Sequence, residues 1–291
     1  MSARRDRFQA WLLLAPMLAI MLGVTAYPIA RTVWLSFTDA GLSGDSSWVG
    51  LANYGDALSN PDYQDAFART LYFTGISVSL EIVLGVLVGL LLNERFPGRA
   101  FVRALMVLPW ALPTIVNAMM WRLILNPQYG SLNALLTQLG LLAKYRSWLG
   151  DPASAMNMVI LADVWKNYSL VALIVLAALQ TIPQDLYEAA RLDGAGAWTR
   201  FWRITLPGIL GPLSVALVLR LIEAFKVFDI IYVMTRGGPA DGTKTVSFYV
   251  YEESFTYLRA GSGAAYAVTV ACVSGLLIAT YILQLRRQGR A

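Results

Sequence analysis

The 291-residue sequence contains no histidine and a single cysteine, and only 14% of its residues are charged. Without histidine and with one thiol, the chain cannot build a zinc site of the usual nitrogen and sulfur type, nor a Ser-His or Cys-His nucleophile pair. An internal disulfide is excluded too, and Cys272 lies in an apolar segment where a small, soft side chain packs well. The scarcity of charge also excludes a soluble globule, because too little polar surface is present to cover one.

Apolar residues are abundant instead, at 57% of the chain, and they gather in six runs of membrane-spanning length. About 20 apolar residues in a helix cross the hydrocarbon core, where only helices and closed barrels satisfy every backbone hydrogen bond. No series of short alternating strands indicates a barrel. The sequence therefore predicts an all-α integral membrane protein with six transmembrane helices, forming a single domain over residues 1–291. The predicted spans are Trp11–Ala30, Thr70–Leu92, Phe101–Leu125, Met156–Ile182, Ile204–Val233 and Ala264–Leu285.

The first run, Trp11–Ala30, is predicted to be a retained span and not a signal peptide, because no convincing small-residue cleavage site follows it. Basic residues flank the six spans unevenly. With the N-terminus inside, four short inner segments contain twelve arginines, whereas the longer outer loops hold more acidic than basic residues. Positive charge is enriched in short cytoplasmic loops, so both termini are expected in the cytoplasm. The net charge of +5 is thus a topology signal, and no clustered basic face indicates nucleic-acid binding.

One segment resembles a phosphate-binding loop but has the wrong spacing. Residues 237–245 read GGPADGTKT, in which Thr243 is inserted between the Gly and the Lys of the pattern G-x-x-x-x-G-K-[ST]. The segment also follows a predicted span on the outer side, whereas a nucleotide loop should follow a buried strand and face cytoplasmic ATP. We interpret it as a Gly-Pro turn. Any ATP used by an assembly that contains this chain is therefore expected on another chain.

A polar stretch, EAARLDGAGAWTRFWRITLP over Glu188–Pro207, separates the fourth and fifth predicted spans. Pro183 suits the first turn of a short helix that ends at Gly194, and Ala197–Ile204 can form a second helical segment. Small side chains permit close approach by another surface, and the charged ones offer directional contacts. Residue chemistry alone leaves two interpretations nearly balanced: a docking helix for a partner, or a solvated hairpin that only connects two spans.

The same stretch resembles, position for position, the EAA signature of permease subunits in bacterial binding-protein-dependent ABC importers. That pattern reads E-A-A-x-x-D-G-A, followed by an aromatic residue and I-x-L-P, and every element is present. The resemblance implies the type I ABC-importer permease fold, with a cytoplasmic coupling loop at residues 183–203 whose helix is seated in the ATPase subunit. The positions to which it gives this ATPase-coupling role are Glu188, Ala189, Ala190, Asp193 and Gly194.

Flanking sequence is similar to the carbohydrate-uptake branch of these importers, and to the permease partner in maltose importers. It reads WRLILNPQYGSLNALL over Trp121–Leu136, DVWKNYSLVALIVLAALQTIPQDLYEAA over Asp163–Ala190 and FKVFDIIYVMTRGGP over Phe225–Pro239. The resemblance implies an ATP-driven importer for a sugar or related carbohydrate in a bacterial cytoplasmic membrane. Its implied partners are a second homologous permease, a homodimer of cytoplasmic ABC ATPase that holds ATP and Mg, and a periplasmic or extracellular sugar-binding protein. No catalysis and no bound cofactor are expected on this chain.

Several charged residues lie within the fourth and fifth predicted spans. A charge at the centre of a spanning helix costs about 2.5–3.5 kcal/mol on insertion scales, so it normally faces a cavity or a partner. Three- and four-residue spacings place such side chains on common helix faces. Polar groups mixed with aromatic rings suit hydroxylated cargo. We therefore predict a substrate path, and the alternative is that the same residues form intrahelical ion pairs that hold subunits together. The path residues are Asp163, Lys166, Asn167, Arg220 and Glu223.

Two other functional classes could use the same charges. An ion-coupled secondary carrier would use Asp163 and Glu223 as proton or sodium sites. A membrane-embedded enzyme would use the same carboxylates for acid–base chemistry. Neither class explains the signature at Glu188–Pro207, so the importer is favoured.

Overall fold

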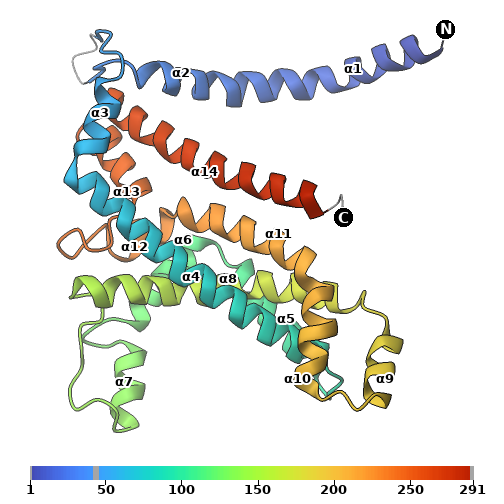
Figure 1. The fold of residues 1–291 in the computed structure, drawn as a ribbon. Coiled ribbons are helices and arrows are strands. Elements are labelled where there is room, and N and C mark those ends of the chain that lie inside the picture. Colours follow the sequence, from blue (N-terminus) through green and yellow to red (C-terminus); the bar gives the residue numbers. More distant parts are fainter. Residues whose placement is uncertain (1, 42–45, 289–291) are drawn as a thin grey trace. The chain divides into compact units, whose positions relative to one another are not determined.

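The computed structural model describes residues 2–41 and 46–288 (Figure 1). Over these residues every element of regular secondary structure is a helix, and the helices are joined by loops with one isolated β-bridge, between Thr38 and Trp48. The chain divides into two compact units. One is Met1–Gln64 with Tyr249–Val273, and the other is Asp65–Phe248 with Ser274–Ala291.

The first unit contains the first apolar helix and a small packed cluster of tyrosines. Helix α1 (Ser2–Met21), the π-helical segment η1 (Leu22–Ala26) and α2 (Tyr27–Leu35) form one continuous helical stretch, of which Trp11–Leu35 is apolar and long enough to span a membrane. Three tyrosines pack together: the rings of Tyr63 and Tyr266 are stacked with centroids 4.6 Å apart, and Tyr249 meets Tyr266 edge to face at 5.3 Å. The remaining elements that enter this unit are α3 (Ala52–Ser59), the start of α4 (Pro61–Asn93), the end of α13 (Val246–Tyr251), η3 (Glu252–Thr256) and the start of α14 (Ala260–Gln288).

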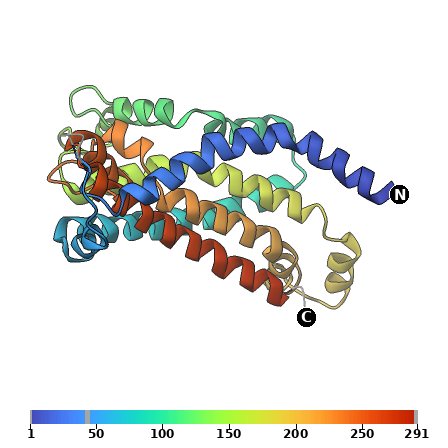
Figure 2. The same ribbon diagram turned by 90° about the horizontal axis from the view of Figure 1, so that it is seen from above.

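The second unit holds the residues that the sequence marks as functional. Its most buried element is α8 (Pro152–Leu179), which begins where the Asp151 carboxylate accepts a hydrogen bond from the Ser154 N–H at 3.0 Å. Seen from above, the axes of α4, α8 and α11 are roughly aligned, and the chain in α11 runs opposite to that in α4 and α8 (Figure 2). The other helices of this unit are α5 (Arg99–Ala111), α6 (Thr114–Ile124), α7 (Ser131–Gln138), α9 (Gln184–Leu192), α10 (Ala197–Arg200), η2 (Phe201–Thr205), α11 (Leu206–Phe225) and α12 (Asp229–Met234).

Within the described residues, five helices are long and apolar enough to cross a membrane, and a sixth span exists if one bent pair of helices is counted as one. These agree with the expectation of six transmembrane helices. The five are Trp11–Leu35, Pro61–Asn93, Pro152–Leu179, Ala197–Phe225 and Ala260–Thr280.

The prediction of one uninterrupted helix over Phe101–Leu125 was wrong. The chain instead forms α5 and α6, which meet at an angle of 98°. Pro113 has no backbone N–H to continue the helix, and its ring pushes the preceding residue out of the helical region. Leu112 accordingly takes an extended conformation, with ψ of 136°.

The prediction of a single helix over Ile204–Val233 also needs correction. Helix α11 ends at Phe225, and the shorter α12 begins only at Asp229. The polar residues Lys226 and Asp229 flank this break and line a cavity described below. Non-helical backbone at membrane depth is tolerated where it is buried in protein or lines a cavity, which explains why a purely apolar run overestimated the helix.

Helices α4 and α8 pack closely because two glycines, one helical turn apart, face two valines. A Cβ atom added at Gly85 would lie 2.5 Å from the Val171 Cβ, and one added at Gly89 would lie 2.7 Å from the Val175 Cγ1. Small residues spaced by four let helix backbones approach closely within a membrane. This contact fixes α8 against α4 and so fixes the polar residues that both helices carry.

Replacing Gly85 by alanine is expected to lower the free energy of unfolding by about 1–3 kcal/mol, because the added methyl group must push the two helices apart. Gly75 is a matched control on the same helix, since among the described residues no atom beyond its own stretch of helix lies within 4 Å of a Cβ placed there. Gly75→Ala should leave stability unchanged or slightly higher. Unfolding by SDS titration in mixed micelles measures both changes, and equal effects of the two substitutions would contradict the close packing.

Candidate functional site

The stretch after α8 forms the short helix that the sequence predicts. Pro183 precedes α9 at its N-cap, one position before the predicted first turn, and the helix ends at Leu192. Gly194 has φ of +76°, a left-handed conformation that favours glycine. The Ala195 N–H donates to the Ala190 carbonyl oxygen at 2.8 Å, and the Gly194 N–H donates to that of Arg191 at 3.1 Å. This pair of bonds is the Schellman arrangement, which stops the helix and turns the chain.

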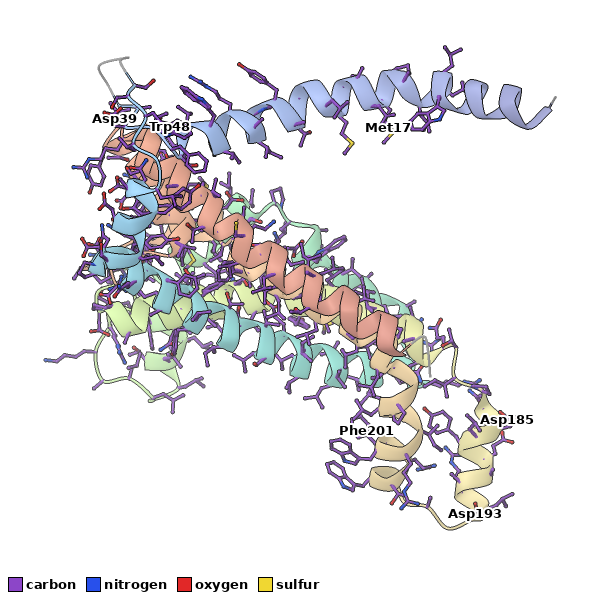
Figure 3. The ribbon with its side chains drawn as sticks, turned by 45° about the horizontal axis from the view of Figure 1, so that its top comes forward. Met17, Asp39, Trp48, Asp185, Asp193 and Phe201 are labelled. Atoms are coloured by element: carbon purple, nitrogen blue, oxygen red, sulfur yellow. The ribbon has the colours of Figure 1, made fainter. Side chains whose placement is uncertain are left out.

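The side chains that α9 presents are largely uncovered. Four of the five residues assigned the coupling role are exposed, namely Glu188, Ala189, Asp193 and Gly194, while Ala190 is half-buried. Figure 3 shows α9, between the labelled Asp185 and Asp193, lying beside the segment that carries Phe201. One polar contact ties it to the next helix, because the Tyr187 hydroxyl lies 3.0 Å from the Thr205 Oγ1. A helix with this exposure has a free face available for a partner.

A cavity of about 370 Å³ lies among α5, α6, α8, α11 and α12. All five residues predicted for the substrate path line it, although they come from two helices far apart in the sequence. Lys226 and Asp229, at the break between α11 and α12, line it as well. The structure therefore brings the predicted polar residues together around one space.

Arg220 is the centre of the charged network beside this cavity. Its Nε and Nη2 donate to the two carboxylate oxygens of Glu81 at 2.6 and 3.0 Å, in a bidentate pair. Nη2 also lies 3.4 Å from the Asp163 Oδ2, and Nη1 donates to Glu223. The side chains of Arg220 and Glu81 are only 4% and 0% exposed. One guanidinium thus joins α4, α8 and α11 and compensates carboxylates that would otherwise be buried without a partner.

The remaining path residues are positioned by hydrogen bonds. The Asn167 Nδ2 donates to the Asp163 Oδ1 at 2.9 Å, which orients this carboxylate along α8. The Lys166 Nζ donates to the Thr114 Oγ1 at 2.5 Å, so this lysine reaches across to the first turn of α6. Spacing allows two intrahelical ion pairs, Asp163 with Lys166 and Arg220 with Glu223. The second forms, whereas the Lys166 Nζ donates to Thr114.

Sequence reasoning did not assign several cavity residues to the path, among them two aromatic side chains and one hydroxyl. Trp110 and Thr114 flank the bend between α5 and α6, and Phe228 lies in the break after α11. Spacing along straight helices could not find them, because each lies at or beside an interruption. Pro113 was the available signal, since a proline within an apolar run marks a probable change of direction.

Comparison with known proteins identifies the family. The family model described as "Binding-protein-dependent transport system inner membrane component" matches residues 81–288. The chain belongs to this family. The matched region includes α9, the cavity and the charged network, so all the candidate site residues lie within it. The chain is thus a multi-pass membrane permease of the binding-protein-dependent type, as the resemblance at Glu188–Pro207 implied.

Several permeases of the family are similar to this chain over almost its whole length. The "Trehalose/maltose transport system permease protein MalF" of Thermococcus litoralis is 40% identical over 98% of this chain and 95% of its own length. The "Sulfoquinovosyl glycerol transport system permease protein SmoG" of Agrobacterium fabrum is 35% identical, covering 97% and 91%. The "Trehalose transport system permease protein SugA" of Mycobacterium tuberculosis is 35% identical, covering 94% and 87%.

Solved structures agree on the fold. A chain of a bacterial ABC transporter involved in the import of the acidic polysaccharide alginate superposes with a TM-score of 0.84 at 25% identity, covering 99% of each chain. A chain of an amino acid ABC transporter superposes with a TM-score of 0.54 at 19% identity, covering 80% of this chain and 97% of the other. This permease therefore has the type I ABC-importer fold.

Proposed function

We propose that this chain is a permease subunit of an ATP-driven importer for a sugar or a related carbohydrate, and that it forms one half of the translocation pore. The observation that carries this proposal is similarity over nearly the full length to permeases named for trehalose, maltose and sulfoquinovosyl glycerol. A second, homologous permease supplies the other half of the pore. A periplasmic or extracellular sugar-binding protein delivers the cargo, as the complex of the alginate transporter with its periplasmic protein suggests by analogy.

The exposed face of α9 couples the permease to a cytoplasmic ATPase homodimer, which binds ATP and Mg. Support comes from the shape of the element: a short, capped helix with exposed Glu188 and Asp193 and with small residues between them. Small side chains allow a groove to close around the helix, and carboxylates form charge-assisted hydrogen bonds with a basic partner. In this arrangement α9 and both termini face the cytoplasm of a bacterial cell.

The cavity around Asn167 is the path of the cargo. Its lining contains three cationic side chains, Lys166, Arg220 and Lys226, and three anionic ones, Asp163, Glu223 and Asp229, so its formal charge balances. A balanced polar lining favours a neutral, hydroxylated molecule over an acidic one. The Trp110 and Phe228 rings at the cavity offer flat faces on which a sugar ring can stack.

A mechanical connection links the two sites. The contact of Tyr187 with Thr205 joins α9 to the segment that continues into α11, and α11 carries Arg220 and Glu223 at the cavity. Movement of α9 on closure of the ATPase dimer therefore tilts α11 and changes which side of the membrane the cavity faces. Rigid displacement of packed helices is a common way to switch between two such states.

Purification of the tagged chain from its native membranes tests the assembly. The expected complex contains a second permease of the same family and an ATPase with an intact phosphate-binding loop, both identified by mass spectrometry. An ion-coupled carrier would instead be isolated without any ATPase, and its consistent absence would contradict the proposal.

A further inference from the structure

The segment after α9 carries a cluster of three aromatic side chains, two exposed and one half-buried, which we call the aromatic face: Trp198, Trp202 and Phe201. The two tryptophans are 73% and 50% exposed. The ring centroids lie 5.7 Å apart for Trp198 and Trp202 and 5.5 Å apart for Phe201 and Trp202, so the rings form one continuous surface. Neither the coupling role of α9 nor the cavity uses these side chains.

The length of the helix that carries the aromatic face indicates how deep the face lies in the membrane. The helical stretch Ala197–Phe225 has 29 residues, which corresponds to about 44 Å at 1.5 Å per residue. The hydrocarbon core of a bilayer is about 30 Å thick, a length that α11 alone covers with its 20 residues. The preceding α10 and η2 therefore lie at the level of the headgroups or beyond it. Figure 1 shows the chain bending between α10 and the body of α11.

The rings point away from the coupling helix. Figure 3 shows the labelled Phe201 on the side of its segment opposite α9. An ATPase seated on α9 would therefore lie on the other side of this segment. Tryptophan is enriched at the boundary between membrane and water, because its ring is apolar and its indole N–H remains hydrogen-bonded.

Two arginines accompany the aromatic face. Arg200 and Arg203 lie within the same two turns, and neither forms an ion pair with any carboxylate in the described part of the chain. The cytoplasmic leaflet carries a negative surface potential, and each basic side chain near it gains about 1 kcal/mol. Aromatic rings with adjacent unpaired arginines are complementary to an anionic lipid surface.

We propose that the aromatic face inserts into the headgroup region of the cytoplasmic leaflet, with Arg200 and Arg203 on anionic lipid headgroups. The lipid then holds α10 and η2 at a fixed depth. Because Thr205 of the same segment contacts Tyr187 of α9, a fixed depth makes this segment the pivot about which movement of α9 tilts α11. The inference goes beyond the proposed function, and only the assignment of the leaflet as cytoplasmic rests on it.

Depth measurement with spin labels tests the anchor. The full chain carries Cys272→Ser, which removes its own thiol, together with Trp198→Cys or Trp202→Cys, and a nitroxide is attached to the introduced cysteine. The labelled protein is reconstituted in phosphatidylcholine vesicles with and without phosphatidylglycerol. Leu192→Cys is the matched control, because Leu192 is 90% exposed at the end of α9. All three sites are exposed, so the labels should leave the fold intact; size-exclusion profiles verify this.

Labels at 198 and 202 are expected to be severalfold more accessible to oxygen than to a water-soluble nickel complex, with the reverse at 192. Adding phosphatidylglycerol should deepen the labels at 198 and 202, and Arg200→Gln with Arg203→Gln should remove that change. Aqueous accessibility at 198 and 202 equal to that at 192 would overturn the proposal and leave the aromatic face as a protein-binding surface. Uptake variants of α9 test the coupling role separately, because Glu188→Lys leaves these rings in place.

Discussion

Replacing Arg220 by methionine is expected to lower the free energy of unfolding by about 3–5 kcal/mol, because it leaves buried carboxylates without a counter-charge. The Glu81 side chain is fully buried, and Arg220 provides both hydrogen bonds to its carboxylate oxygens. Asp163 and Glu223 lose a partner in the same substitution. Methionine fills a similar volume, so the effect isolates the loss of charge from the creation of a cavity.

The measurement is unfolding by SDS titration in mixed micelles, with two comparison variants. Arg69→Met removes an ion pair with Asp65 whose side chains are 27% and 68% exposed, and it should cost less than about 1 kcal/mol. Adding Glu81→Gln to Arg220→Met should recover part of the lost stability, because the carboxylate left behind is then neutral. Equal destabilisation by Arg220→Met and Arg69→Met would show that the buried network contributes no more to stability than an exposed ion pair.

Reversing the charge at Glu188 is expected to reduce coupled sugar uptake more than tenfold while leaving membrane insertion intact. Truncating one member of a charged interfacial pair costs roughly 2–5 kcal/mol, and about 1.4 kcal/mol corresponds to a tenfold change in affinity. Glu188 is exposed and makes none of the hydrogen bonds or ion pairs found among the described side chains, so Glu188→Lys should not disturb the fold. Gln184→Lys, at the exposed start of the same helix, controls for added positive charge.

Substitutions at Gly194 distinguish the effect of disturbing the turn from the effect of adding a charge at the docking surface. Gly194→Asp is expected to uncouple ATP hydrolysis from uptake as well, since it adds a charge at the end of α9 and a side chain at a left-handed position. Gly194→Asn is the matched variant, because asparagine tolerates the same conformation without the charge. Uptake and ATPase activity are measured together in vesicles. Wild-type uptake in both Glu188→Lys and Gly194→Asp would remove the docking role of α9.

Local signals explain why α9 and the turn that follows it were predicted almost to the residue. Pro183 begins the helix and Gly194 ends it, and both act through their own backbone preferences, which do not depend on distant contacts. The interruption at Leu112–Pro113 was a signal of the same kind, but the length of the apolar run concealed it. Hydropathy measures which residues avoid water, and it does not show whether the backbone continues in one direction.

The partners of the charged residues could be predicted only in part. Spacing placed Arg220 beside Glu223, three residues away, and this contact is present. The contact of Arg220 with Glu81 joins residues 139 positions apart, so only the packing of α4 against α8 and α11 determines it. The role of Thr114 as the partner of Lys166 depends likewise on the bend before α6. Long-range contacts of this kind arise from tertiary packing and leave no periodic trace in the sequence.

The most direct test of the account is the energy source for transport. The chain is reconstituted in vesicles with its second permease, its ATPase and its binding protein, and entry of radiolabelled trehalose and maltose is followed with ATP on the ATPase side. The account predicts sugar accumulation that requires ATP and all the subunits, and none by this chain alone under a proton or sodium gradient. Gradient-driven uptake by the chain alone, unaffected by ATP, would contradict it.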